Sequence, residues 1–267
     1  MASGPDQGVT VVPVDFHDPA NALTYSGRNA DPAWGRAVTS LVDATGRTVV
    51  DIGCGGGTYA REWLRLGASA VVGVDSSIPI LGAARADAPA GLELREGDAA
   101  ATGLPGGRHD VVFARALVHH VPDLRSVVAE AHRLLRPGGH YLVQDRTMED
   151  VDQPGSPDHP RGWIFEVFPR LRDVEARRRP DSAALRDAMV AQGLDRPAGR
   201  SLWEVRRHYP DRNAYLADVS ARTGRSLLHE LDDQRARSST CTVGRVVMPF
   251  CRSTRTRILT WDERHPR

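Results

Sequence analysis

The sequence predicts an α/β fold in which helices cover both faces of a doubly wound, mostly parallel sheet. Three observations carry this prediction: short apolar runs alternate with helical patterns, a glycine-rich loop follows the first run, and an acidic residue ends the second. Parallel strands need a long crossover, which is usually a helix. A chain of 267 residues is long enough to bury a sizeable core.

Five apolar runs are expected to form the parallel part of the sheet. They span residues 48–53, 70–75, 92–96, 109–114 and 140–145. The expected helices between them span residues 31–45, 58–67, 77–86 and 123–135. The last of these is the clearest, because Asp123 can cap its start and Pro137-Gly138-Gly139 ends it.

The alternation breaks after residue 145. Residues 146–180 hold five prolines around one helical piece, and we expect them to form a substrate lid inserted after the fifth strand. The expected elements beyond it are a helix at 181–194, a strand at 201–209, a helix at 211–235 and a last strand at 255–261. The domain prediction is an N-terminal segment at 1–30 and one domain at 31–267, which carries the lid and a second helical insertion at 208–240.

The amino-acid composition limits the classes of function and the cellular compartments to be considered. The formal net charge is +1, so no overall field favours nucleic acid. The 35 basic residues are all arginine, which indicates the coding bias of a GC-rich, bacterial genome. Three cysteines are too few for a disulfide framework, and neither a signal peptide nor a membrane-spanning run is seen. We therefore expect a cytoplasmic protein that does not enter a membrane.

The loop in VVDIGCGGGTYA (residues 49–60) is built to approach a ligand closely. Two ligands compete: the pyrophosphate of a dinucleotide and the amino-acid end of S-adenosylmethionine. A dinucleotide fingerprint has a third glycine where this chain has Thr58. Asp51 would repel two phosphates and attract an ammonium group, which favours S-adenosylmethionine.

Two further acids follow the next strands. Asp75 ends the second strand about 20 residues after the loop, where a carboxylate can accept hydrogen bonds from both ribose hydroxyls. Asp98 follows the third strand within EGDA, where it could accept the adenine amino group. An acid at either position could equally cap a helix or form a turn.

Five motifs in order resemble those of class I S-adenosylmethionine-dependent methyltransferases, and most closely the small-molecule enzymes of the methyltransferase type 11 kind. They are VVDIGCGGG, VVGVD, EGDAA, HDVVFARALVHHVPD and LLRPGGHYLVQD. The resemblance is strong over residues 47–145 and weaker beyond them. It implies a Rossmann-like seven-stranded sheet and S-adenosyl-L-methionine as cofactor. It also implies O-, N- or C-methylation of a small-molecule acceptor, such as a secondary metabolite.

The same resemblance implies roles for individual residues. The methionine end would meet Asp51, Gly53, Cys54, Gly55, Ala114 and Arg115. The nucleoside end would meet Asp75, Ser76, Ile80, Asp98 and Ala99. In the N-terminal segment, Tyr25 would help to cover the cofactor and Arg28 would meet the methionine carboxylate, unless Arg28 is simply a solvated surface arginine.

The candidate catalytic residues are His119 and His120, because imidazole titrates near neutral pH and suits a base for a hydroxyl or amine acceptor. They could instead only shape the pocket. No metal site is expected, since adjacent histidines rarely chelate one ion together. The candidate substrate pocket contains His159, Trp163, Phe165 and Phe168, although these aromatics could equally anchor the lid to the core.

Three alternatives remain open at this stage. Arginines near residues 170–179 and at the C-terminal end would suit an RNA methyltransferase, but acids are interleaved with them and no RNA-binding module is present. A non-catalytic S-adenosylmethionine-binding protein would carry the same acids. A dehydrogenase is the weakest alternative. The expected partner is a small-molecule methyl acceptor, with no nucleic acid, and the expected state is a monomer or homodimer.

Overall fold

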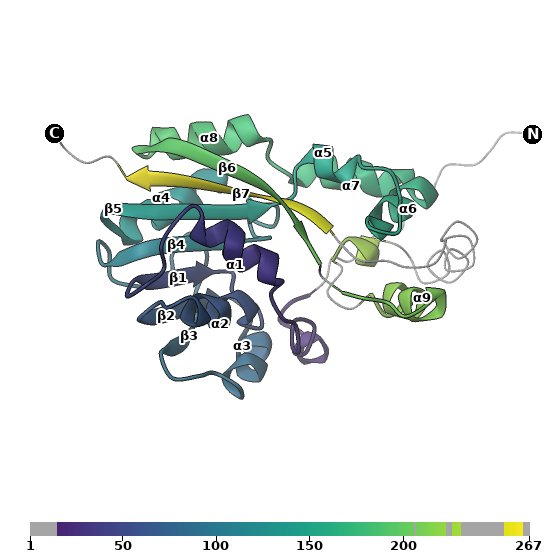
Figure 1. The fold of residues 1–267 in the computed structure, drawn as a ribbon, viewed down its shortest axis with the longest axis horizontal. Helices are drawn as coiled ribbons and strands as arrows, with labels where there is room; N and C mark the ends of the chain where they lie inside the picture. Colours follow the sequence, from purple (N-terminus) through teal and green to yellow (C-terminus); the bar gives the residue numbers. More distant parts are fainter. Residues whose placement is uncertain (1–14, 206, 223–225, 231–253, 264–267) are drawn as a thin grey trace, which may run out of the picture.

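The computed structural model describes residues 15–205, 207–222, 226–230 and 254–263, and it contains a seven-stranded sheet (Figure 1). The strands are β1 (Thr48–Ile52), β2 (Ala70–Asp75), β3 (Leu92–Glu96), β4 (His109–Arg115), β5 (Leu135–Asp145), β6 (Leu194–Glu204) and β7 (Thr254–Glu263). Their order is β3-β2-β1-β4-β5-β7-β6. The first five run parallel, and β7 is antiparallel to β5 and β6. The predicted mostly parallel α/β fold is confirmed.

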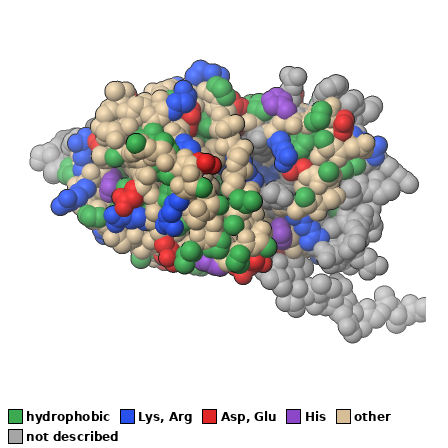
Figure 2. Space-filling model, turned by 90° about the horizontal axis from the view of Figure 1, so that it is seen from below, with side chains coloured by type: hydrophobic (Ala, Val, Ile, Leu, Met, Phe, Trp, Pro, Cys, Tyr) green, Lys and Arg blue, Asp and Glu red, His purple; other side chains and the backbone are tan. Residues whose placement is uncertain are grey.

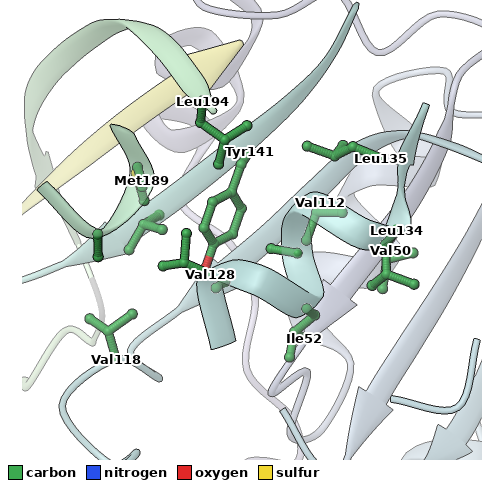
Figure 3. Close-up of a cluster of buried hydrophobic side chains, with 14 of the residues drawn as sticks. Val50, Ile52, Val112, Val118, Val128, Leu134, Leu135, Tyr141, Met189 and Leu194 are labelled. Atoms are coloured by element: carbon green, nitrogen blue, oxygen red, sulfur yellow. The ribbon is translucent and has the colours of Figure 1, made fainter. Parts of the chain in front are cut away.

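Two hydrophobic cores lie on opposite faces of this sheet, because successive side chains of a strand point to opposite faces. Val50 belongs to a core beneath α4 (Leu124–Leu134) and α8 (Ser182–Ala191), shown in Figure 3. Its neighbour Val49 belongs to the core beneath α1 (Pro32–Thr39) and α2 (Thr58–Arg65). Strands buried on both faces give the continuous apolar runs seen in the sequence.

Helix starts follow the capping residues. Asp31 accepts the Ala33 N–H at the start of α1, and Asp123 accepts the Arg125 N–H at the start of α4. The predicted helix at 31–45 ends at Thr39, because Asp43 accepts the Thr45 N–H and forms a turn instead. The helix α3 (Ile78–Arg85) begins after its cap Ser77.

A second group of helices stands at one end of the sheet (Figure 1). It contains α5 (Met148–Val151), α6 (Pro160–Val167), α7 (Pro169–Arg178), α9 (Arg212–Ala221) and the 3-10 helix η2 (Ser226–Glu230). These elements share one hydrophobic core that includes Trp163, Leu171, Tyr215 and Leu227. We call residues 148–178, 209–222 and 226–230 the helical subdomain. The two segments predicted as separate insertions therefore pack together.

The boundaries beyond residue 190 differ from the prediction. The strand predicted at 201–209 begins at Leu194 and ends at Glu204, where the Val205 N–H turns to Asp31. The helix predicted at 211–235 ends at Ala221, and residues 231–235 lie outside the described residues, as do residues 231–240 of the predicted insertion. The predicted last strand at 255–261 corresponds to β7.

A short 3-10 helix, η1 (Pro19–Asn21), lies in the N-terminal segment ahead of α1. None of the helices in the described part of the chain is long and apolar enough to cross a membrane.

Candidate functional site

The glycine loop runs from the end of β1 to α2 and is suspended from β2. Gly53 and Cys54 both donate their N–H groups to the Val74 carbonyl, at 2.7 and 3.0 Å. Gly53, Gly55 and Gly57 have φ values of +72°, +51° and +73°, which side chains of L-residues rarely allow. A Cβ on Gly53 would also lie 2.9 Å from Leu117 Cδ1. The loop therefore needs glycine for its backbone conformation and for its close packing.

Asp75 at the end of β2 fastens the far side of this loop. One carboxylate oxygen accepts the Gly55 N–H at 2.8 Å and the other accepts the Ser77 N–H at 2.9 Å. An ionised carboxylate has about four acceptor positions, so two remain for the hydroxyls of a ribose. The geometry fits the predicted role of Asp75 and adds a second role, the anchoring of the loop.

Cys54 lies beneath the loop and points to the sheet. Its Sγ would be 2.9 Å from a Cβ on Gly73, and burial raises the pKa of its thiol. The Cys54 side chain is therefore an inert packing group. Although Cys54 was predicted to lie at the methionine end, it offers only its backbone to a ligand.

Asp51 in β1 is a carboxyl group held in the interior, with 2% of its surface exposed. Burial raises its pKa to about 8, although Arg115 acts in the opposite direction. A carboxyl group with so high a pKa has incomplete charge compensation. The ammonium of an S-adenosylmethionine methionine end would supply the missing positive charge, so Asp51 fits that group.

Arg115 at the end of β4 is fixed by residues that the sequence did not reveal. Its guanidinium pairs with Glu204 of β6 at 2.6 Å and lies 4.1 Å from the centre of the Tyr59 ring. Tyr59 and Gln144 also donate hydrogen bonds to Glu204. Burial opposes the charge, but Glu204 and the other neighbours raise the pKa of Arg115 above its ordinary value. Glu204 is 89 positions from Arg115, so no local signal pointed to it.

The residues predicted to meet the nucleoside differ in how exposed they are. Ser76 and Asp98 are exposed, and Asp98 accepts the Ala100 N–H at 2.7 Å in a tight turn. Ile80 is buried, with 1% of its surface exposed. Ala99 is half-buried. At the methionine end, the Ala114 side chain belongs to the core, while Ala116 beside it has a φ of +51°, a strained conformation for alanine.

The N-terminal segment lies across the glycine loop, while the predicted role of Tyr25 in covering the cofactor stays a prediction. A Cβ on Gly55 would be 3.3 Å from the Tyr25 ring, and one on Gly56 would be 2.7 Å from the Tyr25 carbonyl. Farther along, the Phe16 carbonyl accepts a 2.5 Å hydrogen bond from Ser77. Arg28 lies over the Tyr25 ring at 4.8 Å and donates to the Thr24 carbonyl, so its role toward a methionine carboxylate stays a prediction.

The two histidines after β4 differ in their surroundings. His119 is buried, and its Nδ1 lies 2.7 Å from a carboxylate oxygen of Asp145 at the end of β5. Burial lowers the pKa of His119 to about 4, against the opposing effect of Asp145. His120 is exposed at the surface, beside the His119 and Phe16 rings. Of these two histidines, only His119 has a carboxylate among the described residues that holds its ring by a hydrogen bond.

The predicted pocket residues lie in the helical subdomain. Trp163 and Phe165 are buried in its core, and Phe168 packs against that core. His159 is buried with 2% of its surface exposed, and burial together with Arg146 and Arg161 lowers its pKa to about 4. Three of the four residues thus contribute to the core of the subdomain. A role of any of the four toward substrate stays a prediction.

The arginines near residues 170–179 do not form one basic surface. The Arg179 side chain is 1% exposed and pairs with Asp145 and Glu175. Acidic and basic side chains are interspersed on the face shown in Figure 2. Within the described ranges, no group of three or more His, Cys, Asp or Glu residues could hold a metal ion.

Comparison with known proteins shows which family the central part of the chain is similar to. Residues 50–143 match the family described as "Methyltransferase domain", of the type 11 kind. The chain is 37% identical over 110 residues to a ubiquinone biosynthesis O-methyltransferase of Cupriavidus pinatubonensis, covering 40% of this chain and 44% of that protein. It is 37% identical over 128 residues to the protein of that name from Pseudomonas paraeruginosa, covering 46% and 50%. The chain thus spans about half the length of the curated relatives that it matches.

Solved structures share the fold. A putative methyltransferase from an antibiotic biosynthesis pathway of Anabaena variabilis superimposes with a TM-score of 0.68 at 17% identity, covering 86% of this chain and 98% of that one. An S-adenosylmethionine-dependent methyltransferase of Mesorhizobium loti has a TM-score of 0.51 at 20% identity, covering 86% and 98%. Residues 50–143 therefore match the methyltransferase domain family of the type 11 kind, and the solved structures show that this chain shares their fold.

Proposed function

We propose that the protein transfers a methyl group from S-adenosylmethionine to a hydroxyl group of a small-molecule acceptor. The observation that carries this proposal is the pair of acids that flank the glycine loop. Asp75 is bonded to the loop and keeps free acceptor positions, and Asp51 is a buried carboxyl group that lacks a full counter-charge. A ribose and an ammonium group satisfy both acids, whereas a pyrophosphate would face two carboxyl groups.

The residues that would hold the cofactor lie at the carboxyl ends of β1, β2 and β4, where ligands bind in open α/β sheets. Asp51 and Gly53 would hold the methionine end, and Asp75 would hold the ribose. Tyr25 would cover the loop from outside. The cofactor supplies an electrophilic methyl group on a sulfonium, so the protein's task is mostly to position the acceptor and exclude water.

The choice of a hydroxyl acceptor rests on His119 and on the names of the relatives. Asp145 holds Nδ1–H of His119, which leaves Nε2 as the acceptor of a proton. With a pKa of about 4, His119 is neutral at physiological pH and can take the hydroxyl proton as the acceptor oxygen attacks. The curated relatives are named O-methyltransferases, which agrees with such a base.

The test is turnover with a panel of acceptors. The purified protein is incubated with S-adenosylmethionine and with catechols, phenols, amines and carbon acids, and the formation of S-adenosylhomocysteine is measured. Turnover with hydroxyl compounds supports the proposal. Turnover only with amines or carbon acids would redirect it to N- or C-methylation. Cofactor binding with no turnover on any class would favour a non-catalytic S-adenosylmethionine-binding protein.

A further inference from the structure

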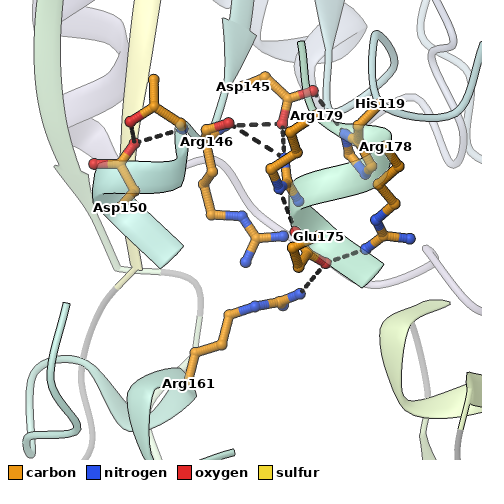
Figure 4. A network of polar contacts seen from close by, with 9 residues as sticks. His119, Asp145, Arg146, Asp150, Arg161, Glu175, Arg178 and Arg179 are labelled. Carbon is orange, nitrogen blue, oxygen red and sulfur yellow. Dashed lines mark hydrogen bonds and ion pairs between the residues drawn. The ribbon is translucent and has the colours of Figure 1, made fainter. Parts of the chain in front are cut away.

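A cluster of charged side chains lies between the end of β5 and the helical subdomain (Figure 4). Glu175 of α7 is fully buried and forms ion pairs with three arginines, Arg161, Arg178 and Arg179. Arg179 also pairs with Asp145 at 2.7 Å, and Asp145 in turn holds His119. The cluster therefore connects directly to the histidine proposed as the base.

Positive charge exceeds negative charge in this cluster. Arg146 joins the three arginines around Glu175 and makes four cations. The carboxylates in the same region are Asp145, Glu175 and Asp150, and the low pKa of His119 keeps that ring neutral. Buried charges are usually paired, so a surplus cation in the interior needs an explanation.

Arg146 is that surplus cation. Within the described residues its guanidinium forms no ion pair and donates no hydrogen bond, and Figure 4 shows it pointing toward Glu175 and Arg161 without a link to either. Burial, reinforced by Arg161 and Arg179, lowers its pKa well below the ordinary value. The residue itself is half-buried rather than sealed, so a ligand can reach it.

Neighbouring polar atoms lack partners as well. Arg179 Nη2 is buried without a hydrogen-bond acceptor in the described part of the chain, and Arg179 lies close enough to Arg146 to depress its pKa. Both ring nitrogens of His159 lack a hydrogen-bond partner there too, and Arg146 in turn depresses the pKa of His159. Polar groups left without partners beside a surplus cation are the pattern expected where an anion binds.

We propose that Arg146 binds a carboxylate or phosphate group of the methyl acceptor, with Arg161 and His159 beside it. The inference rests on the proposed function and names its substrate class, an anionic hydroxyl compound. Arg146 directly follows β5, whose end carries the Asp145 that orients His119. An acceptor held by its anionic end at Arg146 would thus extend toward the base. A planar guanidinium suits bidentate binding of either anion.

Anion-dependent thermal stabilisation tests this proposal. The full-length protein, loaded with S-adenosylhomocysteine, is heated with benzoate, phenyl phosphate or neutral benzamide at constant ionic strength. We expect benzoate or phenyl phosphate to raise the Tm and benzamide to leave it unchanged, because only a ligand of the folded state stabilises it. Whichever of the two anions acts identifies the carboxylate or the phosphate.

Substitutions assign the effect to Arg146. Arg146→Gln should abolish the anion response, while its Tm in chloride alone stays the same or rises, because an unpaired cation is removed. Arg146→Lys should keep a weaker anion response, since lysine keeps the positive charge but lacks the planar guanidinium that binds an anion through two hydrogen bonds. The matched control is Arg172→Gln, which removes an exposed arginine of α7 that pairs with Asp152 outside the cluster. It should respond as the wild type does.

Four results would overturn the proposal. They are no response of the wild type to either anion, an equal response to benzamide and to the anions, an anion response that survives Arg146→Gln, and unfolding of Arg146→Gln in chloride, which would make Arg146 a structural counter-ion. The affinity for S-adenosylhomocysteine is measured separately. If the wild type does not bind S-adenosylhomocysteine, the proposed methyl transfer is refuted. If it binds S-adenosylhomocysteine but shows no anion response, only the anion site is refuted.

Discussion

At the scale of one residue, Asp75 anchors the glycine loop through the Gly55 N–H and is also the residue proposed to hold the ribose. We expect Asp75→Ala to weaken binding of S-adenosylhomocysteine at least tenfold, about 1–3 kcal/mol, because the ribose and the Gly55 N–H both lose their acceptor. Calorimetric titration measures the affinity. Glu93→Ala, which removes an exposed acid of the neighbouring strand, is the control and should bind as the wild type does. Unchanged affinity in Asp75→Ala would exclude Asp75 from the site.

Asp51 predicts a pH dependence of cofactor binding. Its pKa is about 8 in the cofactor-free protein, and a bound ammonium would lower it. Binding must then release a proton below about pH 8, so the affinity for S-adenosylhomocysteine should rise from about pH 6 to about pH 8 and then level off. Asp51→Asn should bind weakly and without this pH dependence. A flat profile in the wild type would show that Asp51 does not meet the ammonium.

His119 and His120 can be separated by matched substitutions. We expect His119→Asn to lower turnover about 10²-fold or more, with S-adenosylhomocysteine affinity unchanged, because general-base catalysis contributes about 10²–10⁴-fold. His120→Asn should retain most of the activity, since His120 is exposed and no carboxylate of the described residues bonds to its ring. Because the pKa of His119 is about 4, turnover in the wild type should not follow a histidine titration near pH 6.5. Equal losses in both variants would refute this assignment.

At the scale of whole elements, the contact between the N-terminal segment and the glycine loop can be tested by substitution. A Cβ on Gly56 would lie 2.7 Å from the Tyr25 carbonyl, whereas one on Gly82 of α3 would have no atom within 4 Å. We therefore expect Gly56→Ala to displace the N-terminal segment and weaken cofactor binding, as measured by calorimetry. Gly82→Ala adds the same methyl group in a helix and should bind normally, with up to about 1 kcal/mol of added stability. Equal affinities in the two variants would show that the segment does not cover the site.

The elements that could be predicted best from the sequence are those whose buried apolar residues form a regular pattern along the chain. The strand at 48–53 and the helix at 123–135 could be predicted because one or both of their faces are buried in the sheet core. The boundaries of β6 could not, because its end is set by the contact of Val205 with Asp31, 174 positions away. The shared core of the helical subdomain was missed for the same reason.

The site shows the same division. Asp51, Asp75 and the loop glycines stand next to strand ends, so their positions follow from the order of strands. In the sequence, Arg146 is an ordinary residue after a strand. The surplus of positive charge around it arises because α6 and the end of α7 bring further arginines beside it. A side chain's charge environment is a property of the folded chain, which a single sequence does not display.

At the scale of the whole molecule, the proposed function gives the sheet the cofactor half of the site and places the acceptor half beside the helical subdomain. The Asp145–His119 pair and the Glu175 cluster lie where the two parts meet. Such a division is common in enzymes, because a rigid sheet can position reacting groups while added segments set specificity. The identity of the cofactor is the claim on which the remaining assignments depend.

Calorimetric titration of the purified protein with S-adenosylmethionine, S-adenosylhomocysteine and NAD(H) tests that claim most directly. The account predicts binding of the first two and no response to NAD(H), because Asp51 and Asp75 favour an ammonium and a ribose over a pyrophosphate. Binding of NAD(H) without the other two would contradict it, and the loop would then have to be a dinucleotide site.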